Sequence, residues 1–152
     1  MDLNVLTFTC LQTGNKRGFI EMITNAETLK EIQKGAVNAL RKSSINDWLK
    51  SHNPSMLNFK IAVENFTKSC AAYSVATYIL GIGDRHNDNV MIKYTGHMFH
   101  IDFGKYLGDA QKFAGFKRDR TPFLFTSDMF YVINQGKDPN IRFQEFIELC
   151  CN

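Results

Sequence analysis

The chain has 152 residues, 44% of them hydrophobic and thirteen of them Phe, which is typical of one globular domain and excludes a disordered chain. A net charge of +3 says little about partners by itself, and we expect no nucleic acid among them. The four cysteines show neither C-x-x-C spacing nor an even ladder, so we expect no zinc site, no disulfide framework and a reducing compartment. No signal peptide is visible, and no apolar run is long enough to span a membrane.

Two strands are predicted at the start of the chain, over 2–11 and 18–23, with a turn containing Gly and Asn between them. Taken alone, these strands indicate only an ordinary hairpin edge. A helix is then predicted to begin at Asn25 and to end near Gly35, because Gly commonly follows the last turn of a helix.

A short helix over 44–49 precedes a much longer one. We expect Asn53 to cap the long helix, with Pro at its first helical position, and Gly81 to stop it after Leu80. Its apolar residues recur every three or four positions, which predicts one buried stripe. The stripe comprises Phe59, Ala62, Val63, Phe66, Cys70, Tyr73, Thr77 and Leu80.

The densest set of reactive side chains lies between Gly81 and Gly104, where G-I-G-D-R-H-N-D-N is followed by two short runs of strand formers and then D-F-G. A Thr-Gly pair separates the two runs, and we read it as a two-residue hairpin turn. Such a turn places Asn89 directly opposite Asp102, with Cα atoms about 4.5 to 5.5 Å apart. An amide oxygen and a carboxylate this close suit Mg²⁺.

The same register divides the hairpin into two faces. The core face is expected to carry Val90, Ile92, Tyr94, Phe99 and Ile101. Met91 shares the other face with the two candidate metal ligands, so it should line the floor of the site. His97 and His100 fall on opposite sides of the hairpin, which favours structural roles for both. An isolated Asn or D-F-G would indicate no more than a surface hairpin with a helix cap.

Residues 105–125 show little periodicity, as in a functional or disordered segment. They include three cations within four residues, namely Lys117, Arg118 and Arg120. Away from a metal site this run would be an ordinary solvated surface. Beside one, its charges could bind the phosphates of a lipid headgroup at a membrane. Two more helices are predicted after it, over 128–133 and 141–151.

The motif resembles the catalytic and activation loops of phosphoinositide 3-kinases, which read G-x-G-D-R-H-x-x-N with D-F-G one hairpin later. The likeness is greatest to class II enzymes, and Gly83 points to their gamma type. It covers nearly the whole chain and implies an α+β, protein-kinase-like fold. Residues 1–24 would be the last small-lobe strands and the hinge. Residues 25–152 would be a large lobe truncated at its C-terminus, with catalytic loop 81–89 and activation segment 102–125.

The resemblance implies transfer of the ATP γ-phosphate to the 3-hydroxyl of phosphatidylinositol or its 4-phosphate. Backbone groups of Glu21 and Ile23 would hold the adenine, with Met22 beside it and Met91 lining the nucleotide site. Asn89 and Asp102 would hold Mg²⁺, with Asp102 also counted among the ATP-binding residues.

His86 is the preferred proton acceptor, because an imidazole titrates near neutral pH, with Asp84 orienting it or accepting the proton itself. Arg85, in the same loop, more often buttresses such a site. The headgroup would be selected by Lys117, Arg118 and Arg120. A cytoplasmic protein associated peripherally with membranes is expected.

The 152 residues contain no Gly-rich phosphate loop and no strand with an ATP-pairing Lys, as if the small lobe were nearly finished where the sequence starts. We therefore expect little lipid kinase activity from this polypeptide alone. One alternative is an inactive module that binds lipids or partners. Another is a metal-dependent hydrolase using Asp84, His86, Asp88 and Asp102, which the hinge-like segment disfavours.

Overall fold

The computed structural model describes residues 2–34, 43–107, 109, 112–113, 116–117, 121–136 and 141–151. The strands are β1 (Cys10–Gly14), β2 (Arg17–Ile20), β3 (Ala26–Thr28), β4 (Val90–Lys93), β5 (Met98–His100), β6 (Lys112–Phe113) and β7 (Phe116–Lys117). The helices are α1 (Leu29–Lys34), α2 (Ser44–His52), α3 (Met56–Leu80), α4 (Ser127–Asn134) and α5 (Ile141–Cys151). Helices combined with small antiparallel sheets confirm the expected α+β class.

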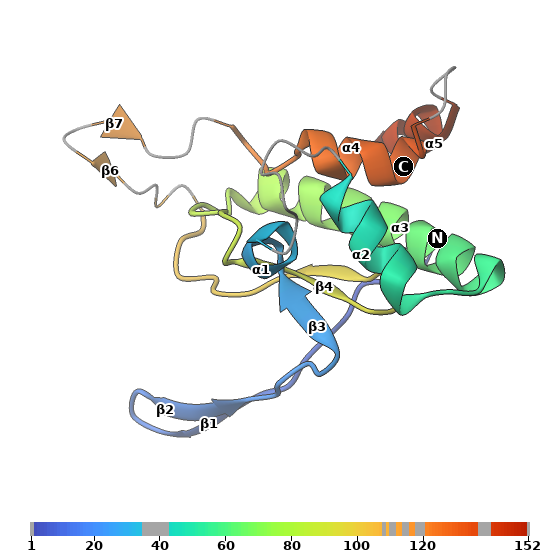
Figure 1. Ribbon diagram of the computed structural model, residues 1–152. Helices are drawn as coiled ribbons and strands as arrows, with labels where there is room; N and C mark the ends of the chain where they lie inside the picture. Colours follow the sequence, from blue (N-terminus) through green and yellow to red (C-terminus); the bar gives the residue numbers. More distant parts are fainter. Residues whose placement is uncertain are drawn as a thin grey trace.

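Helix α3 runs through the centre of the helical part, with α4 and α5 on one side of it and the sheet on the other (Figure 1). That sheet has the strand order β3-β4-β5, and α3 packs against β5. Strands β1 and β2 form a separate antiparallel hairpin that projects away from the helices (Figure 1). The site described below lies between this hairpin and the three-stranded sheet.

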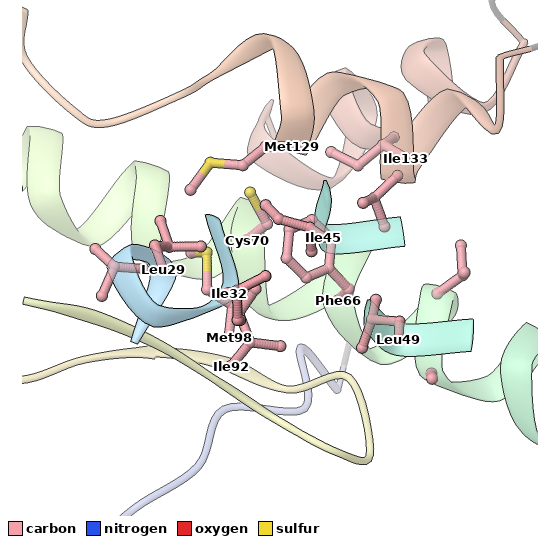
Figure 2. Close-up of a cluster of buried hydrophobic side chains, with 14 of the residues drawn as sticks. Leu29, Ile32, Ile45, Leu49, Phe66, Cys70, Ile92, Met98, Met129 and Ile133 are labelled. Carbon is pink, nitrogen blue, oxygen red and sulfur yellow. The ribbon is translucent and has the colours of Figure 1, made fainter. Parts of the chain in front are cut away.

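Residues from helices α1 to α5 and from the sheet meet in one apolar core. Figure 2 shows the side chains of α1, α2, α3 and α4 converging above β4 and β5. The labelled members are Leu29, Ile32, Ile45, Leu49, Phe66, Cys70, Ile92, Met98, Met129 and Ile133. Burial at this density gives each large side chain on the order of 1.5 to 3 kcal/mol of favourable transfer energy, so the core fixes how α1 and α3 sit on the sheet.

The long helix α3 follows the expected apolar stripe but has a different cap. Ser55 is the N-cap, and its side chain accepts the Asn58 N–H at 3.1 Å. The prediction that Asn53 caps this helix is wrong, because Asn53 ends α2 and its side chain donates to carbonyls there and in the hairpin turn. Gly81 ends α3 with a left-handed φ of 55°, as expected. Leu80, the last stripe residue, is 47% exposed.

The N-terminal elements differ from the sequence-based expectation. The first two strands are shorter than predicted, and the predicted helix start at Asn25 is replaced by strand β3. Ala26 lies opposite Lys93 and Thr28 opposite Met91, so these residues form a strand by pairing with the edge of β4. The helix begins three residues later than Ala26, at Leu29. Pairing with a distant strand has therefore overridden the local helix signal.

Cys10, Cys70, Cys150 and Cys151 are all unpaired. Cys70 is buried beneath α5, and this burial raises the pKa of its thiol to about 12. Cys10 and Cys151 are exposed. In the described part of the chain, no helix combines the length and the apolar character needed to cross a bilayer.

Candidate functional site

The hairpin that carries the candidate metal ligands has a different register from the one predicted. Val90 lies opposite His100, and the Ile101 N–H donates to the Asn89 carbonyl at 3.0 Å, so Asn89 faces Ile101 and not Asp102. The turn is a three-residue loop, since the Lys93 N–H donates to the His97 carbonyl. The two-residue turn was therefore the wrong interpretation. Asp102 is the residue after Ile101, the partner of Asn89, and it lies outside β5, which ends at His100.

The conformation of Gly96 permits a loop of three residues. Gly96 has a φ of +92°, and the third position of such a loop requires a positive φ of this kind. The turn also presses against α3, because a Cβ on Gly96 would lie 2.0 Å from the Ala62 carbonyl oxygen. The Asn65 amide of α3 donates to the Thr95 carbonyl at 2.9 Å. Packing against the helix thus selects this loop and, with it, the register.

The change of register moves the residues of β5 to the opposite face. Met98 and His100 join Val90 and Ile92 toward the core, whereas Phe99 and Ile101 join Met91. The assignment of Phe99 and Ile101 to the core face was wrong for this reason. Met91 keeps its expected face, because residues on β4 alternate in the same way under either register.

A cavity of about 400 Å³ opens on this second face. Its lining joins residues from the first hairpin, the segment after it and the second hairpin. They are Phe8, Cys10, Ile20, Glu21, Met22, Ile23, Met91, Phe99, Ile101, Asp102 and Phe103. All five residues expected to bind ATP therefore line one cavity, which includes two carboxylates, Glu21 and Asp102. A volume of this size and a largely apolar lining are typical of small-molecule sites.

The Glu21 end of the cavity is held by Thr9. The Glu21 N–H donates to the Thr9 carbonyl at 2.8 Å, and the Glu21 carboxylate accepts the Thr9 N–H at 2.9 Å, which lowers the pKa of Glu21. With the Glu21 N–H used in this way, its carbonyl oxygen and the Ile23 N–H are the backbone groups suited to an adenine edge.

The loop after α3 begins at Gly81 and ends in a tight turn. The Asn89 N–H donates to the His86 carbonyl at 2.9 Å, so Asn87 and Asp88 are the two central residues of this turn. The Asn89 side chain is buried, and its amide nitrogen donates to the Asp84 carbonyl at 2.9 Å. The backbone of Asp84 takes a left-handed φ of 58°, which Asp tolerates better than most residues.

Arg85 ties this loop to the segment after β5 that contains Asp102. Its guanidinium donates to the carbonyls of Gly83 at 2.9 Å, of Ile101 at 2.8 Å and of Asp102, and it lies 5.6 Å from the centre of the Phe103 ring. A planar guanidinium presents its N–H donors in a rigid fork and so fixes the directions of three acceptors, whereas a Lys ammonium is a compact charge on a flexible stem. Arg85 thus supports the site and fixes the position of the Asp102 backbone.

His86 lies between two carboxylates. Its Nε2 is 3.9 Å from an oxygen of Asp84, and its Nδ1 is 3.9 Å from an oxygen of Asp88. The Asp88 N–H donates to Nδ1 at 3.2 Å. Because Nδ1 accepts a proton donor, a neutral ring carries its own proton on Nε2, the side facing Asp84.

The donor set fits a divalent cation with few protein ligands. Asn89 offers an amide oxygen, since its nitrogen is the donor to Asp84, and Asp102 offers an exposed carboxylate. Within the described residues, no cluster of three or more His, Cys, Asp or Glu side chains could hold a metal. Mg²⁺ commonly takes one or two protein oxygens and completes its shell with phosphates and water. In donor chemistry the two residues suit Mg²⁺ delivered with a nucleotide, with Asp102 in the cavity lining and Asn89 buried beside the Asp84 carbonyl.

The remaining candidates are His100 and the three cations that follow D-F-G. His100 is buried, and burial together with the nearby Arg85 lowers its pKa to about 3, so it is a neutral core residue. Lys117 falls in β7, opposite Lys112 of β6. Arg118 and Arg120 lie outside the described residues.

Sequence reasoning missed part of the cavity. Phe99 and Ile101 would have been found with the correct register, because alternation alone then places them beside Met91. Phe8 and Cys10 carried no signal in the sequence, since they reach the cavity only through the packing of the first hairpin.

A family model described as phosphatidylinositol 3- and 4-kinase matches residues 1–152. The chain belongs to this kinase family. Three relatives show the range of similarity within it. The phosphatidylinositol 4-phosphate 3-kinase C2 domain-containing subunit beta of Homo sapiens is 56% identical over 99% of this chain and 9% of its own length. The corresponding alpha subunit of Pongo abelii is 54% identical over the same shares.

The phosphatidylinositol 3-kinase C2 domain-containing subunit gamma of Mus musculus is 49% identical over 99% of this chain and 10% of its own length. These C2 domain-containing subunits are the class II kinases, which confirms the expected class. Identity to the gamma subunit is below that to the beta and alpha subunits, so the likeness inferred from Gly83 does not extend to the whole chain. The chain spans about a tenth of the length of these relatives.

Proposed function

We propose that the chain forms the nucleotide pocket and the phosphoryl-transfer loop of a class II phosphatidylinositol 3-kinase with a protein-kinase-like fold. The reaction is transfer of the ATP γ-phosphate to the 3-hydroxyl of phosphatidylinositol or its 4-phosphate. One observation carries the proposal: a single cavity joins the hinge-like Glu21–Ile23 to Met91 and Asp102. Family membership supports the same reading. Residues 1–24 would then close the small lobe, and residues 25–152 would belong to the large lobe.

The residues that line the cavity support a position for each part of the nucleotide. The adenine would lie between Met22 and Met91, with its edge bonded to the backbone of Glu21 and Ile23. Asn89 and Asp102 would hold Mg²⁺ on the ATP phosphates. When bound, this ion would neutralise charge on the phosphates as the γ-phosphate is transferred.

The proton of the attacking hydroxyl would be handled by Asp84 and His86. With the ring proton on Nε2, His86 donates on the side of Asp84, and the Asp84 carboxylate becomes the acceptor of the pair. This reverses the roles that the imidazole pKa alone favoured. Lys117, Arg118 and Arg120 remain the proposed headgroup residues, which would bring the protein to the cytoplasmic surface of a membrane.

Nucleotide binding tests the proposal directly in the 152-residue chain. We expect ATP to bind more tightly with Mg²⁺ than without it, and Asp102→Asn to abolish this difference. Asp109→Asn is a matched control, because Asp109 is exposed, lies seven residues further along and pairs with Lys105. Binding can be followed by calorimetry or by displacement of a fluorescent nucleotide. Equal binding with and without Mg²⁺ in the unmodified chain would contradict the assignment of Asn89 and Asp102.

A second assay separates the kinase from an inactive lipid-binding module. Vesicles containing phosphatidylinositol 4-phosphate are incubated with the chain, MgATP and labelled phosphate. We expect transfer to be very slow, because residues 1–152 offer no Lys for the ATP phosphates. Any transfer that occurs should disappear in Asp102→Asn. Vesicle binding with no nucleotide binding at all would favour the inactive module.

A further inference from the structure

Helix α1 contacts the turn that joins the candidate proton-transfer residue to a candidate metal ligand. His86 begins this turn and Asn89 ends it. Its two central residues, Asn87 and Asp88, point toward α1 and carry no role in the proposed chemistry. Contacts between α1 and these two residues therefore bear on both functional ends of the turn.

Three contacts join α1 to the turn. The backbone N–H of Lys30 donates to the Asn87 carbonyl at 3.0 Å, and the Lys30 ammonium lies 2.9 Å from an oxygen of Asp88. The Asn87 side-chain amide donates to the Gln33 side-chain oxygen at 2.7 Å. One surface hollow is lined by Lys30, His86, Asn87 and Asp88. Two residues one helical turn apart thus hold two adjacent residues of the loop.

Gln33 is itself fixed from the other side. The side chain of Asp128, at the start of α4, is buried and is hydrogen-bonded by Gln33 and by the Ile45 N–H. The Gln33 amide therefore accepts with its oxygen from the loop and donates with its nitrogen to α4. This double engagement leaves one orientation for the amide, and the packed core holds α1 beneath it.

We propose that Lys30 and Gln33 are positioning residues, which hold Asn87 and Asp88 so that the ring proton of His86 stays on Nε2, facing Asp84. Asp88 links the helix to the ring. The Asp88 N–H donates to Nδ1 of His86, and this hydrogen bond forms only while the turn keeps its conformation. The relevance of this arrangement to catalysis rests on the proposed function, but the arrangement itself does not.

Exposed ion pairs contribute little to stability, and the side chains of Lys30 and Asp88 are each 49% exposed. The pair is therefore better suited to fixing the direction of the Asp88 peptide than to stabilising the fold. Its removal should leave the protein folded, and this allows positioning to be separated from folding.

The test reads the tautomer of His86 by long-range ¹H–¹⁵N correlation of the imidazole rings, in alkaline buffer where the rings are neutral. The chain has four His residues, and the His86 signals are identified by their loss in His86→Gln. In the unmodified chain we expect the Nε2-protonated form. In Lys30→Met/Gln33→Leu, loss of the bond to Nδ1 should raise the ratio of Nδ1- to Nε2-protonated ring about fivefold.

Three further variants control for location, for charge and for folding. Lys68→Met/Gln12→Leu makes the same substitutions at residues that contact Glu64 and Gly14 instead of the turn, and it should keep the unmodified tautomer. Lys30→Arg retains a donor for Asp88 and should also keep it. Lys30→Met alone, at a half-exposed side chain, should show a smaller rise and serves as the test if the double variant loses its dispersed spectrum.

An unchanged tautomer in both Lys30→Met and the double variant would overturn the proposal. A shift of equal size in Lys68→Met/Gln12→Leu would overturn it as well, because the effect would then not depend on the turn. Failure of the proposed function looks different: the tautomer would respond as expected, yet the chain would bind no MgATP.

Discussion

Replacing Gly96 by Ala should destabilise the fold by several kcal/mol, because two independent features of the structure oppose a side chain there. The φ of +92° is one that residues with a Cβ rarely adopt, which costs about 1 to 3 kcal/mol. The new Cβ would also lie 2.0 Å from the Ala62 carbonyl oxygen and 2.7 Å from the Ala62 Cα, and neither backbone atom can move without shifting α3.

Relief of this clash requires the turn to lift from α3. Two hydrogen bonds hold it there, from Asn65 to the Thr95 carbonyl and from the Met98 N–H to the Ser69 hydroxyl, both at 2.9 Å. Their loss would cost about 1 kcal/mol each. The total is then about 3 to 5 kcal/mol, a large part of the roughly 5 to 15 kcal/mol that stabilises a typical domain.

Urea unfolding followed by Trp48 fluorescence measures this change. Trp48 is the chain's single Trp, and its ring centre lies 5.5 Å from that of Tyr94 in the same turn. Gly14→Ala is the matched control, since a Cβ at Gly14 would meet nothing within 4 Å, and it should change stability by less than about 0.5 kcal/mol. If Gly96→Ala unfolded within about 1 kcal/mol of the unmodified chain, the loop geometry and the register derived from it would be refuted.

Three further outcomes follow from buried or bridging groups. Because His100 has a folded-state pKa of about 3 and an ordinary pKa near 6.5, only the unfolded state binds its proton between those values. Stability should therefore fall by up to about 1.4 kcal/mol per unit as pH drops below 6.5; the slope of urea-derived stability against pH should lessen in His100→Gln. A maleimide should label Cys10 and Cys151 in the folded chain but reach Cys70 only after denaturation, so rapid labelling that peptide mapping assigns to Cys70 would contradict its burial. Arg85→Met should weaken MgATP binding about tenfold or more while leaving Mg²⁺-free nucleotide binding nearly unchanged, and an equal loss in both conditions would show that Arg85 does not act through Asp102.

The elements that sequence predicted well are those governed by local signals. The last helix has the expected bounds, 141–151, and the long helix ends at Gly81 because a left-handed glycine satisfies its final carbonyls. Met91 could be placed on the site face without knowing the register, since alternation along β4 fixes it relative to Asn89. The motif around Asp84 also identified the loop correctly as the connection between helix and hairpin.

The failures come from contacts between distant parts of the chain. Thr95-Gly96 fits both a two-residue and a three-residue loop, and the choice depends on how closely Gly96 approaches Ala62, thirty-four residues earlier. The pairing of Ala26 with Lys93 likewise overrides a plausible local helix start. Lys30 gave no sign of its role, because its partner Asp88 follows it by fifty-eight positions. Such information appears only once the core has brought α1, α3 and the sheet together.

The segment after Asp102 is attached to the catalytic loop through main-chain atoms. The Gly83 N–H donates to the Lys105 carbonyl at 2.9 Å, and the Leu107 N–H donates to the Leu80 carbonyl at 2.8 Å. Bonds of this kind do not depend on side-chain identity, so mutation along 105–107 leaves the anchor intact. Under the proposed function, evolution could therefore exchange the residues beyond Leu107 to suit another acceptor lipid without rebuilding the loop that carries Asp84 and Asn89.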